Sequence, residues 1–310
     1  MTLNILFSAA DESWPAYQDL LPQTLDDIGI PTLVRRDFAP QDVDYIVYAP
    51  DGPTLDFGVF NRARAVLGLW AGVEKIVTNP TLHLPLARMV DCGLSEGMVE
   101  WVTGHVLRHH LGIDKYIRPA RRDWTPDYPV LARDRSVAIL GLGQLGQACA
   151  QALKSLNFNV LGWSRRKRSM DNIAAYHGTD GLDAVLQRAE ILVLLLPLTD
   201  ATRNIIDEQS LGKMPRQAVI MNPGRGALID DDALIRALDS GQLAHATLDV
   251  FRVEPLPDSH PFWHHPQITV TPHIAAQTRP KTACQVIAEN IRRDQAGEEM
   301  QYLVDRSAGY

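Results

Sequence analysis

The sequence predicts an α/β protein built on mainly parallel sheets, and three observations lead to this fold class. Short apolar runs alternate with helical stretches along most of the chain, which is typical of parallel strands whose connecting helices cover both faces of a sheet. One strand is followed directly by a glycine-rich turn and then a helix. Finally, the chain has 310 residues with 45% hydrophobic content. Domains usually hold roughly 100–200 residues, so we expect two of them.

The first hundred residues predict a small α/β unit. Apolar runs indicate strands at residues 3–7, 45–48, 66–69 and 75–77. From residue 96 to 111 the apolar residues take helical spacing instead. The stretch 118–129 is rich in Pro and Arg and has no periodicity, which indicates a long loop or arm.

A second series of strands follows this arm. The first strand–turn–helix unit is predicted at residues 136–140, 141–146 and 147–156, and the next strand at 160–163. Further strands are predicted at 191–196, 218–221, 246–250 and 268–270, with helical segments between most of them. Residues 281–293 place apolar side chains on one face of a final helix.

Composition excludes several classes of partner. Acidic residues outnumber basic ones by 37 to 30, for a net charge of −7, which argues against a binder of nucleic acid or anionic membranes. The N-terminus lacks a basic signal-peptide start, and the apolar stretch 189–198 is far shorter than the ~20 residues of a membrane helix. Three scattered cysteines suggest buried free thiols, so we expect a cytoplasmic protein.

The glycine-rich turn fits the dinucleotide-binding pattern G-x-G-x-x-G. Its glycines would allow a tight turn, close approach of a pyrophosphate, and close packing of helix on strand. The pyrophosphate would lie at the positive end of the following helix. The alternative is a glycine-rich turn without a ligand. The predicted cofactor residues here are Gly141, Leu142, Gly143, Gln144, Leu145 and Gly146.

The end of the next strand indicates which dinucleotide is bound. An NAD site usually has an acidic residue there, which binds the ribose 2′-hydroxyl. This chain has Ser164, Arg165 and Arg166 instead, and guanidinium groups bind a 2′-phosphate through charge-assisted hydrogen bonds. We therefore predict NADP(H). A solvated basic loop is the alternative, because residues 165–168 are four consecutive cations.

Three residues after later strands form the predicted catalytic set. Arg225 lies between two glycines after the strand at 218–221, where it could clamp a carboxylate and polarise an adjacent carbonyl. His273 and Glu254 also follow strands. A nearby carboxylate favours the protonated imidazolium, which is the proton donor that ketone reduction requires. Taken alone, Arg225 could equally be a surface-turn arginine.

The remaining histidines do not predict a metal site. His260, His264 and His265 lie in a stretch interrupted by prolines and lack the i, i+4 spacing of helical ligands. His109 and His110 are consecutive on a helix and therefore diverge. We expect no metal.

Several spaced motifs together resemble the D-isomer-specific 2-hydroxyacid dehydrogenase family, particularly its glyoxylate/hydroxypyruvate reductase A type. The resemblance covers nearly the whole chain. Besides the glycine pattern, it comprises motifs at residues 70–74, 196–199, 222–226, 248–251, 254–255, 271–273 and 304–310. Departures are Trp70, Glu74 and the Asn222-Pro223 pair, none of which replaces a catalytic group.

The resemblance implies an architecture and further site residues. It implies two Rossmann-like, doubly wound domains separated by an active-site cleft: a substrate domain of residues 1–97 and 278–310, and an NADP domain of 98–277. Arg225 would bind the substrate carboxylate and carbonyl, His273 would be the general acid, and Glu254 would support it. Asp249 would orient the nicotinamide amide. The other cofactor residues implied are Leu196, Pro197, Pro223, Gly224, His273 and Ala275, and the backbone amides of Ala71 and Gly72 would bind the substrate carboxylate. Besides these implied residues, we expect Trp70 and Tyr48 to narrow the substrate pocket toward small, polar 2-oxoacids.

The expected function is NADPH-dependent reduction of glyoxylate, hydroxypyruvate or a similar small 2-oxoacid. The resemblance also implies a homodimer, in which Trp124 of the arm could reach the partner's active site; a lone aromatic residue anchoring a loop is the alternative. A non-catalytic NADP(H)-responsive regulatory protein of the same fold is the second hypothesis, and oxidation of formate or phosphite is a runner-up within the enzymes.

Overall fold

The computed structural model describes residues 2–117, 124 and 126–306 and divides into two compact units. Unit 1 combines Met1–Leu94 with Gln277–Tyr310, and unit 2 is Ser95–Ala276. From the sequence, the boundaries between the two domains were predicted at 97/98 and 277/278. Most of the arm predicted at 118–129 and the end of the motif at 304–310 lie outside the described residues.

Unit 1 is built on a five-stranded, fully parallel sheet in the order β2-β1-β3-β4-β5. Strands β1, β3, β4 and β5 are buried, because helices cover one face of the sheet and packed loop residues cover the other, whereas the edge strand β2 is mostly only partly buried. The strands are β1 Leu3–Ser8, β2 Thr32–Arg35, β3 Tyr45–Tyr48, β4 Ala65–Gly68 and β5 Leu86–Ala87.

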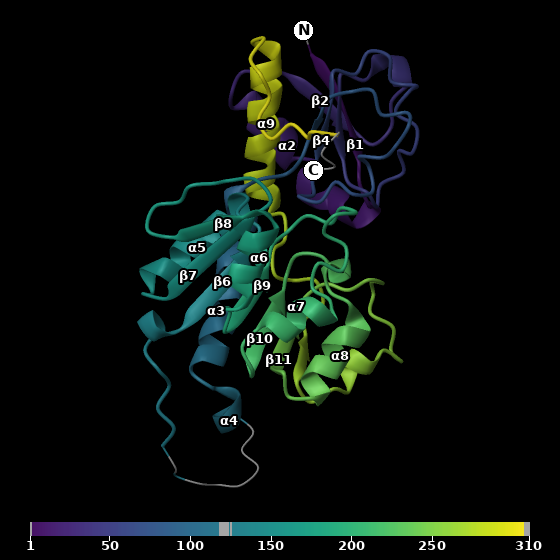
Figure 1. Ribbon diagram of the computed structural model, residues 1–310. Coiled ribbons are helices and arrows are strands. Elements are labelled where there is room, and N and C mark those ends of the chain that lie inside the picture. The colour runs from purple at the N-terminus through teal and green to yellow at the C-terminus, as the bar shows by residue number, and fades with distance from the viewer. Residues whose placement is uncertain (1, 118–123, 125, 307–310) are drawn as a thin grey trace. The chain divides into compact units, whose positions relative to one another are not determined.

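Helices from both ends of the chain cover one face of this sheet. They are α1 Trp14–Tyr17, α2 Leu20–Asp26 and the C-terminal α9 Pro280–Gln295, which packs on α1 and α2 (Figure 1). Ala283, Ile287 and Ile291 lie on one face of α9 and are buried in the same core as β1 and β3. The predicted helix at 281–293 is therefore correct, and its apolar face completes unit 1. Short 3-10 helices lie at Asp11–Ser13 and Pro40–Asp42.

Unit 2 contains a seven-stranded parallel sheet in the order β12-β11-β10-β9-β6-β7-β8. When the strands of this unit are numbered from β6 and read from the β8 edge, the order is 3-2-1-4-5-6 with one added strand. This is the arrangement of a dinucleotide-binding sheet, and its direction of winding changes between β6 and β9. The strands are β6 Ser136–Leu140, β7 Asn159–Ser164, β8 Ala174–His177, β9 Ile191–Leu194, β10 Ala218–Asn222, β11 Leu243–Leu248 and β12 Ile268–Val270.

Hydrophobic clusters lie on both faces of this sheet. The parallel sheet covered on both faces, which the strand–helix alternation predicted, is therefore confirmed, as is the doubly wound arrangement that the resemblance implied. Capping side chains set two of the helix starts: Asp207 accepts from the Ser210 amide, and Asp230 accepts from the Ala233 amide. The helices are α3 Cys92–His110, α4 Asp114–Ile117, α5 Gln144–Ser155, α6 Gly178–Leu186, α7 Glu208–Lys213 and α8 Asp231–Asp239, with 3-10 turns at Ala132–Asp134, Gly226–Leu228 and Pro261–Trp263.

Some local predictions were wrong. Residues 75–77 form a turn rather than a strand, because Ile76 and Val77 pack into the unit 1 core as loop residues. Helix α5 begins at Gln144, three residues before the predicted start at 147. Cys92 is exposed, whereas Cys149 and Cys284 are buried thiols as expected. Within the described part of the chain, no helix is long and apolar enough to cross a membrane.

Candidate active site

The carboxyl ends of six adjacent strands in unit 2 carry nearly all the predicted site residues. Proceeding across the sheet, β7 ends at the predicted 2′-phosphate site, β6 at the glycine turn, and β9 before Leu196. The remaining three strands, β10, β11 and β12, lead into the segments that carry Arg225, Glu254 and His273. The predicted cofactor and catalytic residues thus follow one another along one edge, which is where open α/β sheets bind ligands.

The glycine turn has the shape that a pyrophosphate needs. Gly141 adopts φ +110°, and a Cβ there would lie 2.4 Å from the Leu195 carbonyl oxygen. At Gly146 a Cβ would lie 1.8 Å from the Gly141 carbonyl oxygen, so only glycine allows this contact of helix with strand. A Cβ on Gly143 would meet nothing within 4 Å. The space in front of α5 is therefore open where the pyrophosphate is expected.

The first amides of α5 are available to bind an anion. Gly143 is the N-cap residue, and no side chain caps the helix, so the positive end of the helix dipole faces the open space. Leu142 contributes differently, because its side chain is buried against Gly162 of β7. Leu142 can therefore offer only its backbone to a cofactor. The turn fits a dinucleotide at each glycine position.

Ser164 holds the predicted 2′-phosphate residues in a defined turn. Its hydroxyl is buried and donates to the Arg166 carbonyl oxygen at 2.7 Å. Arg165 and Arg166 are exposed just beyond the end of β7. The site thus offers cationic groups, rather than a carboxylate, where the ribose 2′ position would lie.

Residues after β9 form the other side of the glycine turn. The close approach of Gly141 to the Leu195 carbonyl places the buried Leu196 and the partly exposed Pro197 beside the expected cofactor. The Thr202 hydroxyl donates to the Pro197 carbonyl oxygen at 2.7 Å and so fixes this segment.

The Arg225 turn is shaped by its neighbours on both sides. A Cβ on Gly224 would lie 2.8 Å from the Leu194 carbonyl oxygen, and one on Gly226 would lie 2.1 Å from the Phe251 carbonyl carbon. The turn is therefore packed against the end of β9 and against the segment after β11. Arg225 is partly buried, and its Nη1 donates to the Gly224 carbonyl oxygen at 2.7 Å.

Asn222 stabilises this turn from within. Its side chain is buried, its Nδ2 donates to the Arg225 carbonyl oxygen at 2.8 Å, and its Oδ1 accepts from the Gly224 amide at 3.1 Å. The sequence interpretation treated Asn222 only as a variation outside the catalytic position. Its place directly before a Gly-Arg-Gly turn was a usable signal, because asparagine side chains close such turns by bonding the backbone.

His273 and Glu254 form a direct pair. His273 Nδ1 lies 2.7 Å from Glu254 Oε2, and Glu254 Oε1 accepts from the Phe251 amide at 2.8 Å. One carboxylate oxygen is thus held by the backbone while the other orients the imidazole. Because Nδ1 is engaged, Nε2 is the ring nitrogen left for a substrate, and the His273 side chain is half exposed.

The buried Asp249 organises the segment that carries His273. It is fully buried, and its Oδ1 accepts from the Ile274 amide at 2.9 Å and from the Thr271 hydroxyl. Its Oδ2 accepts from the Ala275 amide at 2.8 Å. The His273 amide also donates to the Asp249 carbonyl oxygen at 2.9 Å. The backbone of this segment is therefore fixed around one carboxylate.

Arg252 links the Glu254 segment to the region that follows the Arg225 turn. Its guanidinium donates to Asn204 Oδ1 and to the Ile229 carbonyl oxygen. Its Nε lies 3.2 Å from Asp231 Oδ2. Sequence reasoning missed Arg252, because all three contacts are made to residues distant in the chain.

The predicted substrate residues lie in unit 1. Tyr48 is buried at the end of β3 and packs edge-on against Phe57 at 5.4 Å between ring centroids. Trp70 is 41% exposed, with Lys75 Nζ 5.9 Å from its ring centroid. Ala71 and Gly72 are partly exposed in the turn after β4.

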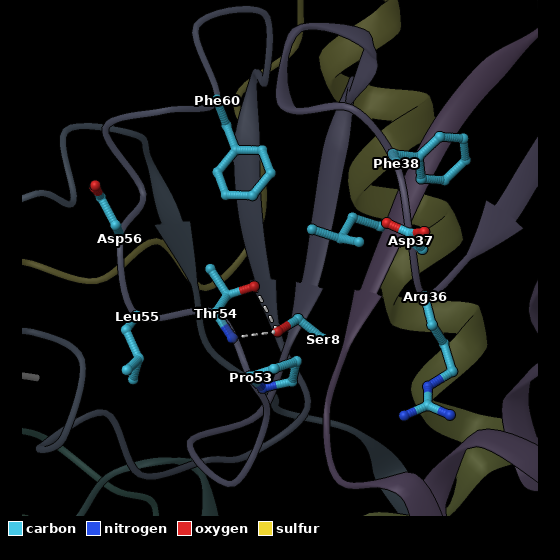
Figure 2. Close-up of a pocket in the computed structure, with 10 residues that line it drawn as sticks. Ser8, Arg36, Asp37, Phe38, Pro53, Thr54, Leu55, Asp56 and Phe60 are labelled. Atoms are coloured by element: carbon cyan, nitrogen blue, oxygen red, sulfur yellow. Dashed lines mark hydrogen bonds between the residues drawn. The ribbon is translucent and has the colours of Figure 1, made fainter.

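A separate cavity of about 300 Å³ opens elsewhere in unit 1, near the carboxyl end of β1. Figure 2 shows Ser8 bonded to Thr54 on one side of this cavity and Arg36 on the other. None of the predicted substrate residues lines it. Arg36 is paired with Asp11. The cavity therefore does not contain the predicted substrate site.

Metal ligation is not indicated in the described residues, where no group of three or more His, Cys, Asp or Glu side chains could hold an ion. His260 instead accepts from the Phe262 amide through Nδ1, and His265 Nε2 lies 3.3 Å from Asp239 Oδ1.

Comparison with known proteins decides the family. Residues 103–275 match the model of the D-isomer specific 2-hydroxyacid dehydrogenase, NAD binding domain. The chain belongs to the D-isomer-specific 2-hydroxyacid dehydrogenase family. The resemblance inferred from the motifs is confirmed, and the glycine turn of this dehydrogenase lies in a nicotinamide-dinucleotide-binding domain.

Relatives of this dehydrogenase span nearly its whole length. It is 38% identical over 257 residues, 80% of its chain and 82% of the other, to a protein of Serratia proteamaculans named glyoxylate/hydroxypyruvate reductase A. A crystal structure of a family member from Xanthobacter autotrophicus Py2, in complex with NADPH and MES, has a TM-score of 0.93 at 36% identity and full coverage of both chains. An NADPH-dependent glyoxylate/hydroxypyruvate reductase of Sinorhizobium meliloti, in complex with NADP and sulfate, has a TM-score of 0.83 at 33% identity, covering 100% of this chain and 99% of the other.

Proposed function

We propose that this dehydrogenase reduces a small 2-oxoacid, glyoxylate or hydroxypyruvate, to the 2-hydroxyacid with NADPH. The observation that carries the proposal is the 2.7 Å contact between His273 Nδ1 and Glu254 Oε2, beside the packed Arg225 turn. The relatives named glyoxylate/hydroxypyruvate reductase support the substrate class. A cytoplasmic location agrees with the buried thiols of Cys149 and Cys284.

The site residues divide the reaction between binding and proton transfer. When bound, NADPH supplies the hydride to C2 of the substrate. Arg225 binds the carboxylate and the adjacent carbonyl, because a guanidinium offers parallel donors to two oxygens. His273 donates the proton from Nε2 to the carbonyl oxygen, while Glu254 keeps the ring oriented and balances the imidazolium charge. Asp249 holds the segment that carries His273.

NADPH oxidation in the presence of glyoxylate tests the proposal. We expect His273→Gln to reduce kcat by roughly 10²- to 10⁴-fold, the usual contribution of a general acid, and to leave NADPH binding unchanged. The matched control is His83→Gln, which removes an exposed histidine of unit 1 and should be neutral. Full activity of the His273 variant contradicts the assigned role. Tight NADPH binding without turnover of any 2-oxoacid favours the regulatory alternative.

The preference for NADP(H) rests on Arg165 and Arg166 at the end of β7. Replacing both with glutamine removes charge-assisted contacts to the 2′-phosphate, so the KM for NADPH should rise about 10- to 100-fold while that for NADH stays nearly constant. Lys154→Gln removes a cation from the opposite end of α5 and is the control. An equal effect on both cofactors contradicts the assignment.

The proposal of a homodimer is supported by exposed apolar residues in and around the arm at 118–129. Trp124 is 99% exposed in this chain, and Tyr128, Leu131 and Ile117 are also well exposed, a pattern that marks interaction surfaces. Sedimentation should show a dimer, and Trp124→Ala should weaken it or raise the KM for glyoxylate. Ile28→Ala, at another exposed apolar position, is the control. Unchanged assembly and unchanged KM in the Trp124 variant contradict this role.

A further inference from the structure

Arg88 lies beside the turn in unit 1 that is expected to bind the substrate. It follows β5 directly, at the carboxyl edge of the sheet. The next amide, that of Met89, donates to the Trp70 carbonyl oxygen at 3.0 Å. A Cβ on Gly68, the last residue of β4, would lie 3.7 Å from the Arg88 Cα. The backbone of Arg88 is thus packed against the start of the turn that contains Ala71 and Gly72.

The charge of Arg88 is not matched by a contacting carboxylate. In the described part of the chain, its guanidinium has no hydrogen bond or ion pair, although the residue is partly buried. Other arginines of unit 1 behave differently: Arg36 pairs with Asp11, Arg62 with Asp44, and Arg64 with Asp294.

An arginine cannot relieve its burial by losing a proton under ordinary conditions. Burial lowers the pKa of Arg88, and Tyr302 and Glu74 only partly oppose this effect. A desolvated cation of this kind is stabilised when an anion binds to it. A second cation lies on the same turn, since Lys75 Nζ is 5.9 Å from the Trp70 ring centroid.

We propose that Arg88 is a specificity residue that binds the carboxylate of the 2-oxoacid, together with the backbone amides of Ala71 and Gly72. This inference rests on the proposed function. A planar guanidinium can bond both oxygens of a carboxylate, whereas an uncharged ester or amide offers it no negative charge. Arg88 therefore selects acids over their neutral derivatives, a different task from that of Arg225, which also contacts the reacting carbonyl.

Steady-state kinetics with an acid and its neutral ester test this role. For Arg88→Met we expect the KM for glyoxylate to rise about 10- to 100-fold and the KM for methyl glyoxylate to change little, because only the acid loses a charged contact. The KM for NADPH should stay constant, and kcat should fall less than kcat/KM. Arg88→Lys keeps a positive charge and should restore part of the preference. Arg36→Met removes a cation that is already paired, from the same edge of the sheet, and is the control.

The outcomes separate this inference from the proposed function. If the wild-type enzyme turns over no 2-oxoacid, the proposed function fails. Oxamate, a carboxylate that cannot accept hydride, is then titrated into the enzyme with NADPH bound and followed by NADPH fluorescence. Weaker oxamate binding in Arg88→Met than in Arg36→Met would still support the carboxylate site. Equal rises in KM for acid and ester, or equal oxamate affinities in the two variants, overturn it. Far-UV circular dichroism checks that each variant is folded.

Discussion

Asp249→Asn should loosen the segment that carries His273. The carboxylate is fully buried and accepts from the Thr271 hydroxyl and from the Ile274 and Ala275 amides. Asparagine keeps one acceptor oxygen and replaces the other with a donating amide group. In the least damaging orientation, Oδ1 retains two donors and the new NH₂ faces the Ala275 amide, which formerly donated at 2.8 Å.

The size of the effect follows from these contacts. A hydrogen bond to a charged group contributes roughly 1.5–3 kcal/mol, and the opposed donor adds the cost of an unsatisfied buried amide. We therefore expect the free energy of unfolding of unit 2 to fall by about 2–4 kcal/mol. Because a displacement of about 1 Å in a reacting group can cost ~10²-fold in rate, kcat should fall by a comparable factor.

Urea unfolding followed by circular dichroism measures the first effect, and initial rates of NADPH oxidation measure the second. Asp200→Asn is the control, because Asp200 is an exposed carboxylate of the same unit. An Asp249 variant that unfolds within about 0.5 kcal/mol of wild type and keeps its kcat would show that the carboxylate does not hold the segment.

Three further changes probe the same unit. Glu254→Gln should lower kcat by at least about tenfold, because the charge that supports the imidazolium is lost. Stopped-flow measurement of glyoxylate reduction tests this, and an unchanged rate would contradict it. Gly226→Ala places a Cβ 2.1 Å from the Phe251 carbonyl carbon and should cost about 1–3 kcal/mol of unfolding free energy by overpacking; a neutral result in urea unfolding argues against that close contact. Burial lowers the pKa of His109 to about 3 and that of His245 to about 4, from 6.5. The unfolded state therefore binds more protons below pH 6.5, so stability should fall as the pH drops from there towards 4. When both histidines are replaced by glutamine, the urea midpoint of unfolding should depend less on pH across this range.

The order of elements in unit 2 was predictable because its central strands β6, β9 and β10 are continuous apolar runs that are almost entirely buried. Strands β6 and β12 have the predicted bounds, and the glycine turn lies where the pattern placed it. Strand β8 was missed because it lies at the sheet edge and is only partly buried. Strand β5 has two residues, too few for any periodicity.

The site was predictable where the type of a residue and its place after a strand are enough to indicate its chemistry. The Glu254–His273 pair is the example, and its contact follows from two adjacent strand ends. The residues that were missed act through tertiary contacts. The side chain of Arg252 reaches two other segments, one at Asn204 and one at Ile229 and Asp231. The side chain of Arg88 is notable because no carboxylate contacts it among the described residues. Neither property appears in local sequence.

The discontinuity of unit 1 has a consequence for how the chain is made. Unit 2 is one uninterrupted stretch, Ser95–Ala276, whereas the core of unit 1 includes Ala283, Ile287 and Ile291 of α9. A ribosome releases the chain from its N-terminus, and domains generally fold as units while synthesis proceeds. The first strands of unit 1 must therefore wait, with an apolar face uncovered, until the last helix emerges, while unit 2 can already fold. A chain that is truncated before residue 280 and released from the ribosome should consequently resist protease in unit 2 and be cut in unit 1.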